Sequence, residues 1–224
     1  MNDLNRSLSM LKSVIVGDSL HFRESDNSFD LVPVKDLLAS GPRNGYSPKT
    51  TSNGKGYRTF PISAIRDGKV KLDPSNFKYA EITKSEFSAN KISSGDIFVV
   101  RGNGNVNLVG SAGMVETDLP DVFYPDILIK IPIRREIVDP EYFVAVWNSP
   151  FVRKQILAMA QTTNGTYKIN KSIVESIKFP LPPKIFQRKI TYALSESAQF
   201  LEESGSKLQH LKNINQKLVE KLIG

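Results

Sequence analysis

The chain of 224 residues contains no cysteine, and this absence removes several classes of site at once. Without cysteine a protein has no disulfide, no thiolate zinc site and no thiol nucleophile. Only two histidines occur, His21 and His210, and they stand too far apart in sequence to match the short spacings of metal-ligand motifs. The sequence therefore predicts neither a metal centre nor a bound cofactor.

Long hydrophobic runs are also missing. No apolar stretch reaches the ~18 residues that a transmembrane helix requires, and the first residues lack the apolar core of a signal peptide. Apolar residues make up 40% and charged residues 24% of the chain, which is ordinary for a folded globular protein. We therefore expect a soluble protein of the cytoplasm.

Acidic residues are scarce in two places. Lysine and arginine total 30 against 23 aspartates and glutamates, so the formal net charge is +7 at pH 7. The segments 42–58 and 149–174 hold several basic residues, including Arg153, and no acid. Basic, turn-rich segments of this kind are typical of surfaces that face phosphate, which makes nucleic acid the first partner to consider. An ordinary solvated surface is the alternative.

Two glycine-rich loops carry side chains suited to nucleic acid. The loop 42–58 interleaves basic and aromatic residues, and the loop 102–107, reading GNGNVN, follows the β-prone stretch 97–101. Basic side chains bind phosphate, tyrosine can stack on a base, and asparagine can bond to base edges. A flexible surface loop explains the residues of 42–58 equally well, and a tight turn explains the glycines of 102–107. GNGNVN lacks the third glycine and the following helix of a dinucleotide site.

A third segment, 161–171, reads QTTNGTYKINK and places a polar turn before two lysines. Together with the two loops it supplies the side chains that we predict to contact DNA. They are Arg43, Lys49, Lys55, Tyr57, Arg58, Arg101, Asn103, Asn105, Thr163, Asn164, Tyr167, Lys168 and Lys171.

Short strand patterns alternate with short helices between residues 31 and 183. Strands are predicted at 57–62, 97–101, 108–115 and 122–131, the middle two forming a hairpin-like unit. Thr83 and Glu86 fit a capping box, and Asp139 with Pro140 fits a helix start. Leucines at helical spacing predict a short helical segment within 1–30. The expected fold is α+β, a mixed β-rich domain with short helices.

The segment 164–187 forms a hinge, because Pro180, Pro182 and Pro183 can continue neither a helix nor a central strand. From 184 onward, apolar and small residues alternate at spacings of four and three, which is a heptad pattern. A helix over 184–222 would be about 58 Å long, too long to pack wholly on its own body. We expect an exposed coiled-coil arm that pairs through Ile190, Leu194, Leu201, Leu208, Leu211, Asn215, Leu218 and Leu222.

The residues 148–151, reading NSPF, are similar to the [DNS]PP[YF] element of amino-methyltransferases. Serine replaces the first proline of that element, and no glycine loop for S-adenosylmethionine precedes it. A helix break explains these four residues better than a catalytic loop.

Taken in order, several fragments resemble the DNA specificity subunit of type I restriction–modification systems. The likeness covers about residues 31 to 222, and Ile185 and Phe186 stand where acidic residues are usual in this family. The matching fragments are GDIFV at 95–99 with Arg101, Val109-Gly110, DPEYF at 139–143 with Asn148-Ser149, Gly165-Thr166, INK at 169–171, Ile177, FPLPP at 179–183, Gln187 and Ile190.

The resemblance implies a non-catalytic reader of double-stranded DNA. It divides the chain into a helical segment 1–30, a target recognition domain 31–183 and a spacer helix 184–224. Family members normally hold two recognition domains and two helices, so this chain is similar to one half, either a natural half-length subunit or a fragment.

The resemblance also implies partners. These are methyltransferase subunits, which carry S-adenosylmethionine, a restriction subunit, and a second copy paired through antiparallel C-terminal helices. A protein-interaction module with a coiled-coil arm and no DNA specificity is the alternative function.

Overall fold

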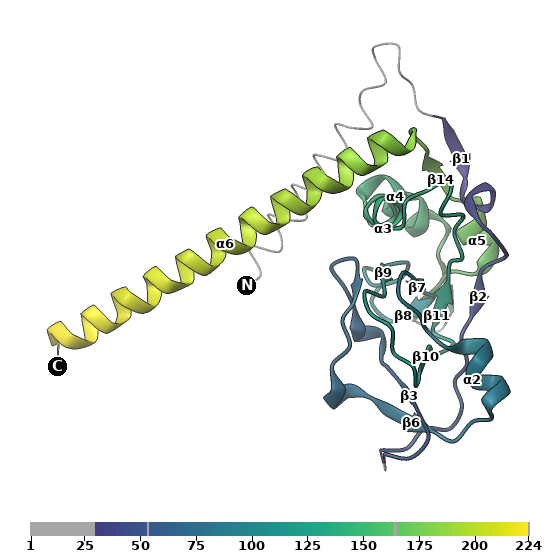
Figure 1. Cartoon of the computed structure of the whole chain (residues 1–224), viewed down its shortest axis with the longest axis horizontal. Helices are drawn as coiled ribbons and strands as arrows, with labels where there is room; N and C mark the ends of the chain where they lie inside the picture. The colour runs from purple at the N-terminus through teal and green to yellow at the C-terminus, as the bar shows by residue number, and fades with distance from the viewer. Residues whose placement is uncertain (1–29, 53, 164, 224) are drawn as a thin grey trace.

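The computed structural model describes residues 30–52, 54–163 and 165–223, with side chains except at 163, 201–202 and 208–223. The predicted N-terminal helical segment therefore lies outside the described residues, apart from Asp30. A mixed body of strands and short helices forms one end of the molecule, and the helix α6 (Lys184–Ile223) projects from it (Figure 1). No helix in the described ranges is both long and apolar enough to cross a membrane.

A six-stranded sheet runs through the body. Its order is β2 (Arg43–Asn44), β11 (Leu128–Lys130), β7 (Ile97–Val100), β9 (Ala112–Met114), β5 (Lys69–Val70) and β4 (Ile65–Arg66). The predicted hairpin-like unit is confirmed, because β7 and β9 pair antiparallel with Val99 opposite Ala112.

All four residues of β7 are buried, and they divide between two cores. Because successive side chains of a strand point to opposite faces, Ile97 and Val99 pack into one core while Phe98 and Val100 pack into the other. The first, which we term the helix-side core, also contains Trp147 and side chains of the helices. The sheet is thus covered on both faces.

Three short helices build the helix-side core: α3 (Pro140–Trp147), α4 (Pro150–Met159) and α5 (Lys171–Ser176). Two of its large aromatic side chains have hydrogen-bond partners: Trp147 Nε1 donates to Gly110 O at 2.7 Å, and Tyr142 Oη donates to Pro180 O at 3.1 Å. The predicted start of α3 at Pro140 is confirmed. Its N-cap residue, Asp139, makes no capping hydrogen bond with its side chain.

Smaller sheets complete the body. β3 (Tyr57–Thr59) lies between β10 (Val122–Phe123) and β6 (Lys78–Ala80). β1 (Leu31–Pro33) pairs antiparallel with β14 (Lys178–Pro180), which ties the start of the described chain to the base of α6. A third sheet holds β12 (Gln161–Thr163), β13 (Thr166–Lys168) and β8 (Gly102–Asn103).

Short helical turns connect these strands. They are η2 (Val34–Leu37), η3 (Ile62–Ala64) and η4 (Pro74–Asn76), and α2 (Lys84–Asn90) follows β6. The predicted capping box of Thr83 and Glu86 is present at the start of α2. The predicted fold class, a β-rich α+β body followed by a long C-terminal helix, is confirmed.

The NSPF residues break the chain between α3 and α4. Asn148 Oδ1 accepts from Ala112 N at 2.9 Å, and Asn148 Nδ2 donates to Ala112 O at 3.0 Å. The amide is therefore fully paired with the backbone of β9. This arrangement agrees with a helix break.

Candidate nucleic-acid interface

Two of the three segments predicted to contact DNA meet in one small antiparallel sheet. β13 pairs with β8, so Tyr167 lies opposite Asn103 and Lys168 opposite Gly102. Directly opposed residues share a face of the sheet, which places Tyr167 beside Asn103. On the other face a Cβ at residue 102 would lie 3.0 Å from Lys168 Cγ, so glycine leaves room for the lysine stem.

The loop after β2 joins this sheet through Asp126. Ser47 Oγ donates to Asp126 Oδ1 at 2.6 Å, and Arg101 Nη1 lies 4.0 Å from Asp126 Oδ2. We term the resulting surface, made of 45–50, 101–107, 126–127, 161–163 and 165–168, the hairpin surface. Ser47 and Asp126 are single polar residues in turns, and no sequence pattern identified them as part of it.

Close backbone packing and a side-chain bond to α2 also hold the loop after β2 in place. A Cβ at Gly45 would lie 2.3 Å from Tyr124 O. Only glycine therefore lets the loop lie directly on the backbone of Tyr124 and Pro125. Tyr46 Oη donates to Glu86 Oε1 at 3.0 Å. This bond to a carboxylate raises the pKa of Tyr46 above its ordinary value, and the pKa of Glu86 is lowered chiefly by its bond from Thr83 N. The loop is thereby anchored to α2.

The asparagines of the GNGNVN loop shape its turns. Asn103 Oδ1 accepts from Asn105 N at 2.8 Å, and Asn105 Oδ1 accepts from Asn107 N at 3.0 Å. Both asparagine side chains therefore shape turns of the loop, whereas neither Gly102 nor Gly104 has a positive φ, so the expectation that a tight turn explains these glycines is not confirmed. An amide whose oxygen is engaged in this way can still offer its Nδ2 donors to a base edge, so DNA contact by Asn103 and Asn105 stays a prediction.

Arg153 of α4 supports the same loop from inside. Its guanidinium donates to Asn107 O at 3.1 Å, to Val106 O at 3.4 Å and to Val109 O. Burial lowers the pKa of Arg153 below its ordinary value. This corrects the expectation of phosphate-facing charge along the whole segment 149–174, because the Arg153 head is bound by carbonyl groups.

The structure likewise corrects the expectation of free side chains at Tyr57 and Arg58. The Tyr57 ring stacks on Phe87 with ring centroids 4.0 Å apart. Arg58 Nε donates to Asp121 Oδ2 at 2.6 Å, its Nη2 donates to the other carboxylate oxygen, and its guanidinium lies 4.6 Å from the centroid of Phe77. The pKa of Arg58 is raised, chiefly by the bond to Asp121. Both side chains serve the fold.

Replacing either member of this pair, by Arg58→Ala or Asp121→Ala, is expected to lower the free energy of unfolding by about 1 kcal/mol. The side chains are 26% and 45% exposed, so water screens the pair and keeps its contribution modest. Urea unfolding of both variants and of the double variant measures the coupling. Arg58→Ala should also leave the salt dependence of DNA binding unchanged. A fall of about one in that slope would instead show a phosphate contact.

The remaining predicted DNA contacts lie in other parts of the chain. Arg43 is exposed on β2, and Lys49 and Lys55 are exposed in the loop that follows. Lys171 is exposed at the start of α5, where the Asn170 side chain accepts from Ile173 N at 2.9 Å. The side chain of Thr163 and all of Asn164 lie outside the described residues. Among the residues described, no cluster of acidic or histidine side chains could hold a metal ion.

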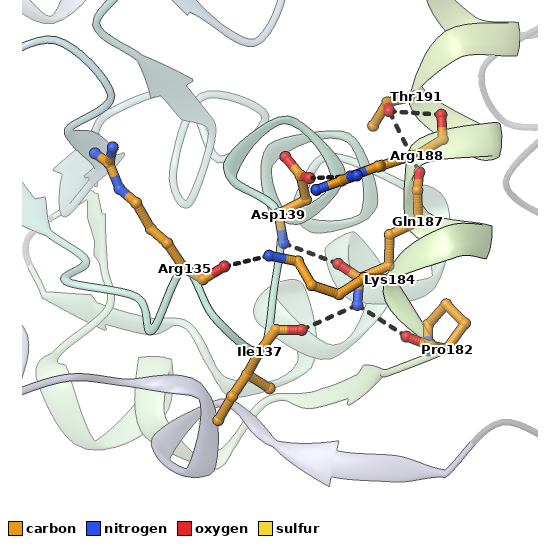
Figure 2. A network of polar contacts seen from close by, with 8 residues as sticks. All are labelled: Arg135, Ile137, Asp139, Pro182, Lys184, Gln187, Arg188 and Thr191. Carbon is orange, nitrogen blue, oxygen red and sulfur yellow. Dashed lines mark hydrogen bonds and ion pairs between the residues drawn. The ribbon is translucent and has the colours of Figure 1, made fainter.

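The hinge between body and helix is a polar junction (Figure 2). Gln187 is 0% exposed: its Oε1 accepts from Asp139 N at 2.8 Å, and its Nε2 donates to Ile137 O at 3.1 Å and to Pro182 O at 2.8 Å. Around it, Lys184 Nζ donates to Arg135 O, and Arg188 Nε lies 3.8 Å from Asp139 Oδ2.

Apolar contacts extend the junction along α6. Leu194 is 6% exposed within the helix-side core, and Ile190 packs against that core. This corrects the expectation that Leu194 pairs with another helix, because its own body covers it, while Ile190 is only partly buried and its pairing stays a prediction. Further along α6, Phe200 is 69% exposed. The remaining residues predicted to pair with another helix have side chains outside the described set: Leu201, Leu208, Leu211, Asn215, Leu218 and Leu222.

No protein-family model matches the chain. Individual proteins do. The type I restriction enzyme EcoKI specificity subunit of Escherichia coli strain K12 is 27% identical over 184 residues, which cover 80% of this chain and 39% of that protein. The HsdS subunit from Thermoanaerobacter tengcongensis has a TM-score of 0.59 at 14% identity, over 91% of this chain and 47% of that chain. The chain resembles one half of a type I specificity subunit.

A second solved structure, which concerns complex assembly of the type I R-M system, contains a chain with the same fold. Its TM-score is 0.63 at 16% identity, and the match covers 94% of this chain and 50% of that chain. The predicted resemblance is therefore confirmed. The chain spans half the length of these relatives or less.

Several residues that carry the specificity-subunit resemblance build the frame of the molecule. Gly95 adopts φ 78°, and a Cβ there would lie 2.4 Å from Arg135 Nη2. Asp139 and Pro140 begin α3, Asn148 pairs with β9, and Gln187 holds α6. The residues named here that carry the resemblance thus support the architecture. They do not identify which side chains of the hairpin surface contact DNA.

Proposed function

We propose that the chain reads one half of a bipartite site in double-stranded DNA, as one recognition unit of a type I specificity subunit. The observation that carries this proposal is the hairpin surface, which collects predicted contact residues from three separate segments. Relatives named as specificity subunits support it. In this proposal residues 31–183 form the recognition domain, residues 184–224 form the spacer helix, and the chain performs no chemistry itself.

The hairpin surface offers two kinds of contact. Arg101, Lys168 and Lys49 provide positive charge for phosphate, and such contacts position a protein on the duplex without reading sequence. Asn103 and Tyr167 lie side by side on the face of the small sheet opposite to Lys168, and both offer polar groups to base edges. Asp126 is the acid within this surface, and it holds Arg101 and Ser47 together.

The long helix supplies the spacing in this proposal. α6 contains 40 residues, and at about 1.5 Å per residue it is about 60 Å long. Only its first turns are held by the body through Gln187, Ile190 and Leu194, and the remainder projects away (Figure 1). Two copies joined through this projecting part would read a two-fold symmetric site, because protein symmetry is mirrored in the DNA.

The same helices would dock methyltransferase subunits, which hold S-adenosylmethionine, and through them a restriction subunit. Exposed apolar side chains on α6 support a protein partner. Ile185 is 59% exposed and Tyr192 67% exposed.

The test is selection from a randomised duplex library by the purified chain, alone and with a methyltransferase subunit. We expect one half-site to be enriched, and two inverted copies at a fixed separation where the chain dimerises. Light scattering measures the mass of the same samples. Absence of any enrichment in both samples would contradict the proposal, and partner binding that is independent of salt would then favour a scaffold module.

A further inference from the structure

One buried amide joins the body of the protein to its projecting helix. All the hydrogen-bonding groups of the Gln187 side chain are used: its oxygen accepts from Asp139 N, and its nitrogen donates to Ile137 O and Pro182 O. These partners are backbone groups on two different segments, the start of α3 and the proline-rich linker before α6. The side chain therefore links the helix to both.

Apolar packing alone would leave the direction of α6 loosely fixed. Leu194 and Ile190 provide the apolar contact to the helix-side core. Helix packing of this kind tolerates a scatter of about 15–20° in crossing angle, whereas hydrogen bonds weaken steeply away from their preferred geometry. The Arg188–Asp139 contact is 3.8 Å long with Arg188 70% exposed, so water screens it. Gln187 is the directional element that water does not reach.

We propose that Gln187 is a positioning residue that sets the direction in which α6 leaves the body and, through it, the separation between two DNA half-sites. The second part rests on the proposed function. The helix amplifies small changes, because about 54 Å separate Gln187 from the end of α6 at about 1.5 Å per residue. A tilt of about 15° would move that end by about 14 Å, which equals about four base-pair steps of about 3.4 Å.

The chain allows a direct measurement, since it contains no cysteine. Cysteines introduced at Ser88 on α2 and Lys207 on α6, both exposed, accept spin labels without any background. Pulsed electron paramagnetic resonance then gives the distance distribution between body and helix in the full chain without DNA. Gln187→Leu introduces an apolar side chain of similar size and removes all three hydrogen bonds. We expect its distance distribution to shift and broaden.

Gln155 offers a matched control. Its Nε2 donates to Lys178 O at 2.9 Å and its Oε1 accepts from Lys178 N at 2.8 Å, so it also pairs with backbone, but it joins α4 to β14. Gln155→Leu should lower stability and leave the distance distribution as in the parent. An unchanged distribution in Gln187→Leu, or an equal change in both variants, would overturn the inference.

Selection from a duplex library completes the test. Gln187→Leu should enrich the same half-site as the parent, while the preference for one separation over its neighbours falls severalfold. An unchanged preference with a changed distance distribution would overturn the link to spacing. If the parent itself enriches no sequence, the proposed function fails, and the distance distribution alone still decides whether Gln187 sets the direction of α6.

Discussion

Replacing Arg101 and Lys168 together with alanine is expected to lower duplex affinity roughly thirtyfold at about 0.15 M salt. Each phosphate contact releases about 0.9 counterion on B-DNA, so the slope of log affinity against log salt should fall by about two. Arg101 is 37% exposed, and its Nη1 lies 4.0 Å from Asp126 Oδ2 and 3.5 Å from Asp126 O. An exposed pair at this distance is weak, so the guanidinium can turn to a phosphate at little expense. Fluorescence anisotropy at several salt concentrations measures both quantities.

Lys35 and Lys178 provide a control with the same loss of charge. Both are exposed, on η2 and β14, and neither belongs to the hairpin surface. The double alanine variant at these positions should leave the salt slope unchanged. An equal loss in the two double variants would show that net charge rather than contact matters, and no loss in the Arg101 and Lys168 variant would remove the hairpin surface from the proposal.

Features that depend on neighbouring residues could be predicted from the sequence. The β-prone stretch 97–101 predicted a strand, Thr83 with Glu86 predicted a cap, and the prolines before 184 predicted the base of a long helix. Each of these elements depends on backbone preferences or periodic burial within a few residues. The structure contains all three.

Pairings between distant residues could not be predicted in the same way. Arg58 and Asp121 are 63 residues apart, and a basic residue suited to phosphate is equally suited to a carboxylate within the fold. The loop 102–107 and the segment 161–171 were each predicted to contact DNA, but their pairing through β8 and β13 follows from sheet topology alone. Leu194 fits the heptad pattern, yet its own body covers it, because periodicity identifies an apolar face and not its partner.

Replacing Arg153 with methionine is expected to lower the free energy of unfolding by about 3 kcal/mol, since hydrogen bonds from charged groups contribute about 1.5–3 kcal/mol each and unsatisfied acceptors remain behind. Asn107 O and Val109 O would lose the guanidinium donor, while Val106 O keeps its bond from Val109 N. Methionine fills much of the volume of the arginine stem, so the change in stability reports mainly the loss of the guanidinium group. Urea unfolding measures the loss, and hydrogen exchange of the amides at 103–109 should show faster opening of the loop.

Lys154 separates this structural role from a role in phosphate binding. It is the next residue on α4, it carries the same charge, and it is exposed. Lys154→Met should therefore leave stability and the exchange of the loop almost unchanged. Arg153→Lys should recover part of the stability, because one ammonium group can reach fewer of the three carbonyl groups than a planar guanidinium. If Arg153→Met instead kept full stability and lowered the salt slope of DNA binding by about one, the guanidinium would have to leave the loop and bind phosphate.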